Sequence, residues 1–363
     1  MSARIHFLQP YIPTYRVPFF ERLVEAGRGS GIEIVVYAGA PKGMMEARAD
    51  RATGHRWEHR ITHRVLRIGG RRFAFPRVDR GFFRHADGIV VGLEGTLPQA
   101  YSGLLLQARH RLRLGVWGHI RPYTTPGNPI DLAAERFLMR HASQVFAYTP
   151  GGAAYAIEHG TRPERITTTM NTIDTGDAEM ELSDDEIGTF RATLGLDVQS
   201  RVFAFIGGLD MAKRVDFLAA VLDAVEIADP SARFLIAGRG ADERLLDRAV
   251  ARGQALRLGP ANGEIKARVG AVSEAFIMPG RIGLVAVDAL ALGIPIVSTD
   301  WAFHAPEIEY LTMGDSLFFA PNDPVAFARF LLDHRFERRR REYPGLDDMV
   351  GRFLQGLQRM LGD

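Results

Sequence analysis

Residues 279–300, "PGRIGLVAVDALALGIPIVSTD", hold a glycine-rich turn between two buried segments. The run before them, residues 274–279, predicts a buried strand. Residues 284–293 predict a helix that ends at a glycine, and a second strand follows at 294–300. A strand, a tight turn, a helix and another strand form the repeating unit of a doubly wound α/β domain.

The turn also predicts an anion site. The first amides of a helix have no partner within the helix and lie at the positive end of its dipole, which is where phosphate binds. Gly283 allows an anion to approach the backbone closely, and Asp288, on the second helical turn, can accept hydrogen bonds from a ribose diol. The predicted phosphate-binding amides are those of Arg281, Ile282, Gly283 and Leu284. The alternative is an ordinary strand–turn–helix unit, and the motif alone leaves both open.

The same alternation runs through the whole chain. Strands are predicted at 4–8, 32–39, 86–92, 112–119 and 143–149, and again at 201–209, 232–240, 255–260, 274–280 and 294–300. Continuous apolar strands separated by helices indicate parallel sheets that are covered on both faces. The sequence therefore predicts two doubly wound, Rossmann-like α/β domains that face each other across a ligand cleft.

The predicted domain limits follow from a polar, acidic stretch at 174–190. The first domain spans 1–173 and the second spans 174–346. The closing residues, 347–363, contain an amphipathic helix that is expected to pack back on the first domain.

Composition excludes several classes of protein. The chain has 363 residues and a net charge of +2, which does not indicate nucleic-acid binding. It has no cysteine, which excludes disulfides, zinc–thiolate sites and thiol nucleophiles. No signal peptide and no apolar run long enough to cross a membrane are recognised. We therefore expect a cytoplasmic protein that meets a membrane, if at all, at the inner surface.

A second motif, "FIGGLDMAKRVDFL" at 205–218, places two cations after a glycine turn. Cations at the start of a helix oppose its dipole, so a bound anion is the better explanation than a solvated surface. Lys213 is a mobile point charge and Arg214 is a bidentate fork, and together they suit a diphosphate beside Gly207 and Gly208.

Two further places carry candidate side chains. His119 ends the predicted strand 112–119, at the carboxyl end where α/β domains bind ligands. A lone histidine is more often structural, but this position favours a site. Within 303–319, His304, Glu307 and Glu309 either face the ligand or cap the next helix.

These motifs resemble the retaining glycosyltransferases of the large family 4, which have the GT-B fold and use nucleotide-activated sugars. "GLVAVDALALGIPIVSTD", "GGLDMAKRVDFL", "FLIAGRGADERLL" and "TMNTIDT" are similar to family motifs in the right order and at the right spacing. "HAPEIEYL" and "YIPTYRVPFF" are similar to a subgroup that takes part in polysaccharide assembly.

The resemblance implies retaining sugar transfer from a nucleotide-diphosphate sugar to a glycan or lipid-linked acceptor. Cations and a helix start carry the charge of the leaving group, so neither a metal nor another cofactor is expected. The resemblance assigns catalytic positions to His119, Lys213 and Arg214, the ribose to Asp288, the base edge to Leu258 and Gly259, and acceptor contacts to Tyr15, Arg16 and Arg121.

The sequence departs from the family at two positions. The first of two family glutamates falls on Gly280 and the second on Asp288, so Glu307 is expected to supply the missing donor contact. A family arginine falls on Gly208, and Arg214 is expected to replace it.

The acceptor is expected on the first domain. Residues 40–77 are rich in arginine and histidine with interleaved Met, Trp and Phe, which suits anionic lipid head groups or a lipid-linked diphosphate. An exposed loop region is the alternative. The arginine run at 335–344 also contains glutamates and indicates a solvated face.

Two other functions stay open. A nucleotide-sugar epimerase has the same architecture but needs no acceptor. A two-domain, non-catalytic sugar-binding protein would ignore nucleotide diphosphates. A dinucleotide dehydrogenase is disfavoured, because no G-x-G-x-x-G follows the first strand.

Overall fold

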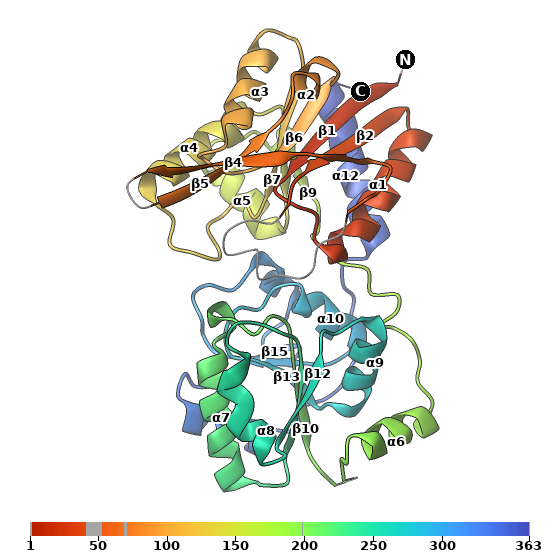
Figure 1. The fold of residues 1–363 in the computed structure, drawn as a ribbon, viewed down its shortest axis with the longest axis vertical. Coiled ribbons are helices and arrows are strands. Elements are labelled where there is room, and N and C mark those ends of the chain that lie inside the picture. Colours follow the sequence, from red (N-terminus) through yellow and green to blue (C-terminus); the bar gives the residue numbers. More distant parts are fainter. Residues whose placement is uncertain (1, 41–52, 69–70, 198, 363) are drawn as a thin grey trace. The chain divides into compact units, whose positions relative to one another are not determined.

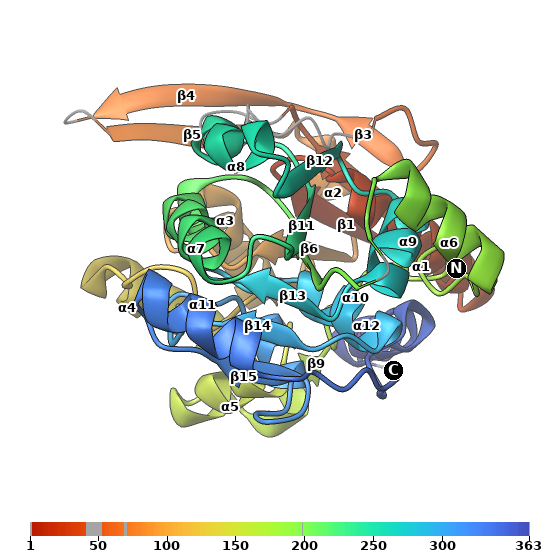
Figure 2. The ribbon, with the colours of Figure 1, turned by 90° about the horizontal axis from the view of Figure 1, so that it is seen from below.

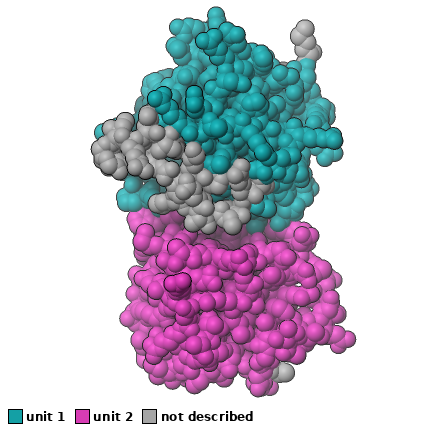
Figure 3. Space-filling model, viewed as in Figure 1, with its two compact units in different colours: residues 1–174, 344–363 teal, residues 175–343 magenta. Residues whose placement is uncertain are grey.

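The computed structural model of the chain describes residues 2–40, 53–68, 71–197 and 199–362. It divides into two compact units, which Figure 3 shows in different colours. Unit 1 is Met1–Asp174 together with Pro344–Asp363, and unit 2 is Thr175–Tyr343. From the sequence we predicted that the chain passes from one unit to the other at 173–174 and returns at 346–347.

Unit 1 is built on a seven-stranded parallel sheet of order β3-β2-β1-β6-β7-β8-β9 (Figure 1). Its strands are β1 (Ala3–Gln9), β2 (Ile32–Ala38), β3 (Glu58–Arg60), β6 (Gly88–Gly92), β7 (Arg113–Gly118), β8 (Gln144–Ala147) and β9 (Ile166–Thr168). Its helices are α1 (Val17–Gly29), α2 (Gly81–Arg84), α3 (Pro98–Ala108), α4 (Pro129–His141), α5 (Pro150–Glu158) and α12 (Leu346–Leu361), with short 3₁₀ turns at Thr14–Arg16 and Pro163–Arg165.

The sheet of unit 1 separates two hydrophobic cores. Ile5 and Phe7 of β1 belong to the core beneath α1 and α12, whereas the next residue, Leu8, belongs to the core beneath α3, α4 and α5. This alternation follows from the two-residue period of a strand. Phe353 of α12 stacks on Phe146 of β8, with 4.3 Å between ring centroids. The last helix of the chain is thus part of the core of unit 1.

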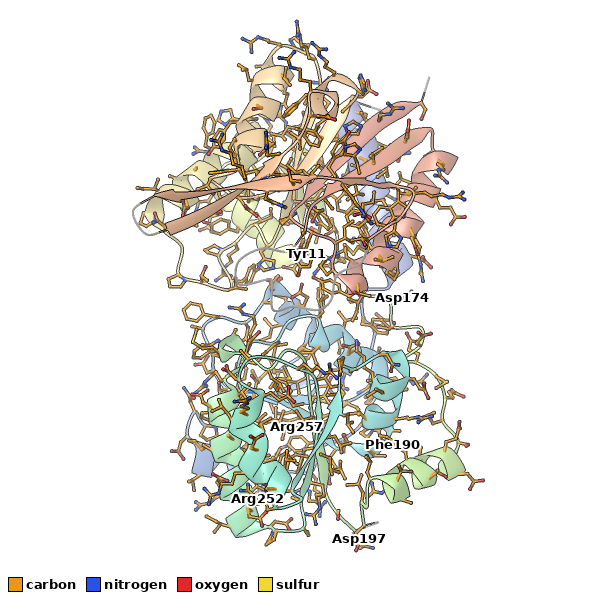
Figure 4. All side chains as sticks on the ribbon, viewed as in Figure 1. Tyr11, Asp174, Phe190, Asp197, Arg252 and Arg257 are labelled. Carbon is orange, nitrogen blue, oxygen red and sulfur yellow. The ribbon has the colours of Figure 1, made fainter. Side chains whose placement is uncertain are left out.

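Ion pairs hold the start of α12 to α1. Arg22 donates to Asp174 and to Asp347, both at 2.8 Å. Figure 4 labels Asp174 at the end of the first segment of unit 1. The two chain segments that leave and re-enter unit 1 are therefore tied to the same arginine.

An antiparallel hairpin, β4 (Thr62–Ile68) and β5 (Arg71–Arg77), forms a separate two-stranded sheet in unit 1. Figures 1 and 2 show it as a ribbon of its own beside the main sheet. We expected a loop or a membrane contact at 40–77, so these strands were missed. Residues 41–52 and 69–70 of that segment lie outside the described residues.

Unit 2 has a six-stranded parallel sheet of order β12-β11-β10-β13-β14-β15. Its strands are β10 (Val202–Ile206), β11 (Arg233–Ala237), β12 (Ala255–Gly259), β13 (Ala275–Met278), β14 (Ile296–Ser298) and β15 (Leu317–Phe319). Its helices are α6 (Asp184–Thr193), α7 (Val215–Ala228), α8 (Asp247–Ala251), α9 (Gly263–Val272), α10 (Val285–Leu292) and α11 (Pro324–Asp333), and its 3₁₀ turns are η4 (Met211–Lys213), η5 (Glu243–Leu246) and η6 (Pro306–Tyr310).

Both sheets have the doubly wound strand order, which confirms the predicted fold class of two Rossmann-like domains. In unit 2 the order reverses between β10 and β13, and in unit 1 it reverses between β1 and β6. Ligands of such sheets bind at the carboxyl ends of the strands beside this switch point. Each unit therefore has one preferred place for a ligand.

Candidate functional site

The switch point of unit 2 is formed by the turns that follow β10 and β13, and a neighbouring turn follows β11. Glycines pack these turns together: a Cβ on Gly238 would overlap the carbonyl oxygen of Gly207, and one on Gly240 would overlap that of Leu209. Backbone hydrogen bonds run from the Gly207 amide to Ala237 O and from the Leu209 amide to Arg239 O. The loop that carries the predicted cations is thus held against a fixed backbone.

Gly280 holds this loop from the other side. A Cβ on Gly280 would lie 2.5 Å from the carbonyl carbon of Lys213 and 2.6 Å from Ala212 O. Backbone therefore fills the space in which the glutamate expected from the resemblance would begin. No side chain fits at position 280 unless the Ala212–Lys213 backbone moves.

Lys213 lies between the two turns. Its Nζ donates to Arg281 O at 2.5 Å and lies 3.9 Å from the point where a Cβ on Gly207 would stand. The ammonium group is therefore at the carboxyl ends of both β10 and β13.

Arg214 has a left-handed backbone conformation, with φ +54° and ψ +52°. Its guanidinium lies between the rings of Phe217 and Trp301, at 4.2 and 4.9 Å from their centroids. Nη1 donates to Thr299 Oγ1 at 3.0 Å. Burial lowers the pKa of Arg214, but a guanidinium stays charged in proteins.

The other edge of the Arg214 guanidinium is available. No described residue accepts a hydrogen bond from its Nε or Nη2, and no described carboxylate pairs with it. Nε and Nη2 are the two donors of a bidentate fork. The rings of Phe217 and Trp301 thus hold the guanidinium in place and leave its Nε and Nη2 donors open to a ligand.

The turn after β13 corrects part of the prediction for its amides. The Arg281 amide donates to Ala212 O at 2.8 Å, and the Ile282 amide donates to His304 Nδ1 at 3.0 Å. These two amides are not available to an anion in this conformation. The amides of Gly283 and Leu284, just before α10, donate to no described group. The predicted phosphate site therefore narrows to these two.

Asp288 is 3% exposed and pairs with Lys266 of α9, with 2.8 Å between Oδ1 and Nζ. Burial raises the pKa of Asp288, and the Lys266 ammonium opposes that rise. Its Oδ2 accepts no hydrogen bond from a described residue, so it can still bind a hydroxyl. Sequence reasoning missed Lys266, because nothing local to α9 signals a buried partner 22 residues away.

The remaining predicted donor contacts lie on neighbouring elements of unit 2. Gly259 ends β12 with φ +73°, and Leu258 is half-buried. Glu307 is 3% exposed within η6. The segment before η6 is bonded to the turn after β13, because the Ala305 amide donates to Ile282 O at 2.8 Å.

In unit 1, His119 follows β7 in a turn of unusual backbone. The next residue, Ile120, has φ +69°, which is strained for a β-branched side chain. The His119 ring packs edge-on against Tyr148, with 5.1 Å between centroids. Strain of this kind is concentrated at functional sites, which favours a role for this turn.

The three predicted acceptor residues differ in exposure. Tyr15 is 41% exposed, and Arg121 is exposed with its guanidinium 5.3 Å from the Tyr123 ring centroid. Arg16, in contrast, is only 5% exposed and donates to Asn171 Oδ1 at 2.9 Å.

The buried Arg16 packs within the unit. Its guanidinium also lies 5.3 Å from the Trp117 centroid and 5.8 Å from the Tyr148 centroid. Arg16 therefore supports the ring beside His119 instead of presenting a surface contact, which corrects its predicted role.

The described helices include none that is both long and apolar enough to span a lipid bilayer.

Residues 200–334 match the family described as "Glycosyl transferases group 1". This range holds β10, the loop with Lys213 and Arg214, the turn after β13 and Asp288. A search of curated proteins by sequence gave no match.

Solved structures similar to this chain include a complex of HepE from Anabaena with UDP and glucose, with a TM-score of 0.64, 15% identity, and coverage of 98% of this chain and 99% of that one. Sucrose-phosphate synthase from Thermosynechococcus elongatus has a TM-score of 0.61 and 14% identity, with coverage of 99% of this chain and 94% of that one. A putative UDP-N-acetylglucosamine 2-epimerase from Listeria monocytogenes has a TM-score of 0.62 and 12% identity, with coverage of 99% of this chain and 96% of that one. At these identities the likeness establishes the two-domain Rossmann-like fold, and the candidate site of unit 2 lies within the range that matches the family model.

Proposed function

We propose that this protein transfers a sugar, with retention of anomeric configuration, from a nucleotide-diphosphate sugar to a glycan or lipid-linked acceptor. One observation carries the proposal. Lys213, the open edge of Arg214 and the free amides of Gly283 and Leu284 flank the switch point of unit 2, within the segment that matches the glycosyltransferase family.

These groups suit the chemistry of the donor. When the bond between the sugar and the phosphate breaks, positive charge develops on the sugar and negative charge on the leaving diphosphate. Fixed cations and amides stabilise that diphosphate most strongly when they are already oriented before the reaction. In the proposal, Lys213 and Arg214 bind it, and the helix start at α10 adds two hydrogen bonds. This arrangement requires no metal or other cofactor.

In the proposal, the remaining predicted residues of unit 2 bind the other parts of the donor. Asp288 Oδ2 would accept from the ribose, the backbone at Leu258 and Gly259 would meet the base, and Glu307 would contact the donor sugar. Similar solved structures are complexes of HepE with UDP and with UDP-glucose, which supports a nucleotide sugar as the ligand class.

The acceptor side belongs to unit 1 in this proposal. His119 would act on the donor sugar or on the acceptor, with Tyr15 and Arg121 as exposed acceptor contacts. The leaving phosphate itself would take the proton of the acceptor hydroxyl, so no protein base is needed. A lipid-linked acceptor would bring the protein to the inner, anionic surface of a membrane through residues 40–77.

Thermal-shift measurement with UDP-, ADP- and GDP-sugars tests the donor. A ligand that binds only the folded protein raises its melting temperature by mass action. We expect at least one nucleotide sugar to do so in the wild type and to fail with Lys213→Ala. If no nucleotide diphosphate or nucleotide sugar shifts the melting temperature, both the proposal and the donor site are wrong.

An epimerase is the second candidate, because a putative UDP-N-acetylglucosamine 2-epimerase has the same fold with a similar TM-score. The two functions differ in their need for an acceptor. Conversion of the sugar of a bound nucleotide sugar with no acceptor present would favour the epimerase. Release of the free nucleotide diphosphate only with an acceptor would favour transfer. Binding of free sugars with no response to nucleotides would indicate a non-catalytic sugar-binding protein.

A further inference from the structure

His304 is a buried histidine at the edge of the candidate site of unit 2. It follows β14 and is 7% exposed. Its Nδ1 lies 3.0 Å from the Ile282 amide nitrogen, and its Nε2 lies 3.2 Å from Thr299 O. The ring stacks on Phe319 with an interplanar angle of 9°. Both ring nitrogens are therefore engaged with backbone groups.

The two partners select one protonation state of His304. The Ile282 amide can only donate, so Nδ1 must carry a lone pair. Thr299 O can only accept, so Nε2 must carry the proton. The neutral, Nε2-protonated imidazole satisfies both contacts, and the doubly protonated imidazolium does not.

The contact between His304 and Ile282 lies beside the amides of the candidate phosphate site. Ile282 is fixed on both sides of its peptide, by His304 at its amide and by the Ala305 amide at its carbonyl oxygen. The next two residues, Gly283 and Leu284, provide the amides that donate to no described group. The orientation of these amides therefore depends on where Ile282 is held.

The charges around His304 oppose its protonation. Burial lowers the pKa of His304, and the cations Lys213 and Arg281 lower it further, whereas the Thr299 carbonyl and Asp300 raise it. A proton on Nδ1 would face the Ile282 N–H with a second donor. It would also add a third positive charge beside two cations. At neutral pH the turn is thus held, and acid releases the contact.

We propose that His304 is a positioning residue for the nucleotide sugar. As a neutral imidazole it holds the turn at 281–284 in the conformation that binds the diphosphate. Protonation at Nδ1 breaks the contact with Ile282 and releases the turn from that conformation. The inference rests on the proposed function for the ligand, but the contact between His304 and Ile282 exists without it. Affinity for a nucleotide sugar should therefore fall with pH, at pH values where the diphosphate of the ligand itself does not titrate.

Calorimetry tests the inference with whichever of UDP-glucose, ADP-glucose and GDP-mannose binds most tightly. The diphosphate of a nucleotide sugar has no group that titrates near neutrality, so a change in affinity with pH comes from the protein. For the wild type we expect affinity to fall roughly tenfold between about pH 7.5 and about pH 4.5, with the fall at pH values below the ordinary histidine pKa of 6.5, because burial lowers the pKa of His304. His304→Asn keeps an acceptor near the position of Nδ1 and does not titrate, so its affinity should change less than about threefold over the same range. His304→Ala should bind weakly at both pH values.

His334→Asn is the matched control, because His334 also lies in unit 2 but packs against Phe318, Phe330 and Phe336. It should show the same fall in affinity as the wild type. A wild type whose affinity does not fall with pH, or a His304→Asn variant that falls as steeply as the wild type, overturns the inference. So does a His334→Asn variant that loses the pH dependence.

Hydrogen exchange separates this inference from the proposed function. The protection factor of the Ile282 amide should drop in acid in the wild type and should be low at all pH values in His304→Ala. If no nucleotide sugar binds at neutral pH, the proposed function fails, and unchanged protection of Ile282 in His304→Ala would overturn the positioning role on its own.

Discussion

The backbone of Lys213 lies 2.5 Å from the point where a Cβ on Gly280 would stand. The turns after β10 and β13, which flank the switch point of unit 2, are therefore packed directly on each other. A glycine at position 280 is the condition for this contact, and the contact places Lys213 at the end of both strands. At position 280 a backbone contact thus takes the space of the glutamate that the resemblance led us to expect.

We predict that Gly280→Ala destabilises unit 2 and weakens nucleotide-sugar binding. Forcing extra atoms into packed backbone costs about 1–3 kcal/mol, and each kcal/mol lowers the melting temperature by about 2–4 °C in a unit of this size. Gly283→Ala is the control for stability, because its Cβ would lie 3.7 Å from the Ala305 Cβ, an ordinary contact. Equal melting temperatures for the two variants would contradict the packing argument.

We predict that an arginine placed at position 208, where the resemblance led us to expect one, can take over part of the role of Arg214. Arg214→Gly relieves a left-handed backbone but removes the fork, so transfer should fall by more than about tenfold. Gly208 has no positive φ and its nearest atom to an added Cβ is Asp210 Oδ2 at 3.3 Å, so it can carry a side chain. The double variant Gly208→Arg/Arg214→Gly should recover part of the lost activity, measured as kcat/KM. Full activity in Arg214→Gly alone would show that the fork is not used.

Removal of Lys266 should leave a buried, unpaired carboxylate at Asp288. Breaking such a pair costs about 3–5 kcal/mol, and Lys266→Met should show this in denaturant unfolding. The raised pKa of Asp288 sets the sign: the folded state binds the proton more readily than the unfolded state, so the variant should be more stable in acid and should lose stability as pH rises. Lys266→Met/Asp288→Asn should remove most of the penalty. A single variant as stable as the wild type at all pH values would rule out the pairing.

His119 and Lys213 should separate turnover from binding. Lys213→Ala removes a charge that holds the diphosphate in both the ground state and the transition state, so it should raise KM and lower kcat. His119→Ala should lower kcat by about a hundredfold or more with little effect on donor affinity. Steady-state kinetics with donor and acceptor varied independently checks both. Wild-type rates in either variant would remove that residue from the site.

Unit 1 should lose stability in acid through His6. This histidine of β1 is 2% exposed, and its Nδ1 lies 2.9 Å from Phe82 O, to which it donates. Burial lowers the pKa of His6 below its ordinary value of 6.5. The stability that comes from its neutral form is therefore present above pH 6.5 and is lost as pH falls toward the folded-state pKa. His6→Asn keeps a donor for Phe82 O and should flatten the acid limb of the melting temperature. The same limb in both proteins would contradict this assignment.

Much of the fold was predictable because its signals are local. Ten strands were predicted from apolar runs of a few residues, and the structure contains all ten. The strands that were missed include β3, β9 and β15, each of three residues at the edge of its sheet. Such short strands carry too few residues for a pattern, and their pairing comes from the neighbouring strand.

At the candidate site, in contrast, the partners of the predicted residues could not be read from local sequence. The sequence determined which residues follow the strands at the switch point of unit 2, because chain order and strand order bring Lys213 and Gly283 to the same edge. Only the tertiary structure decided that the Ile282 amide is taken by His304, that Asp288 pairs with Lys266, and that Arg214 is clamped by Trp301. These partners lie on other elements, 22 to 87 residues along the chain. Periodicity and turn chemistry depend on neighbours in the sequence, whereas hydrogen bonds and charge pairs depend on which elements the fold brings together.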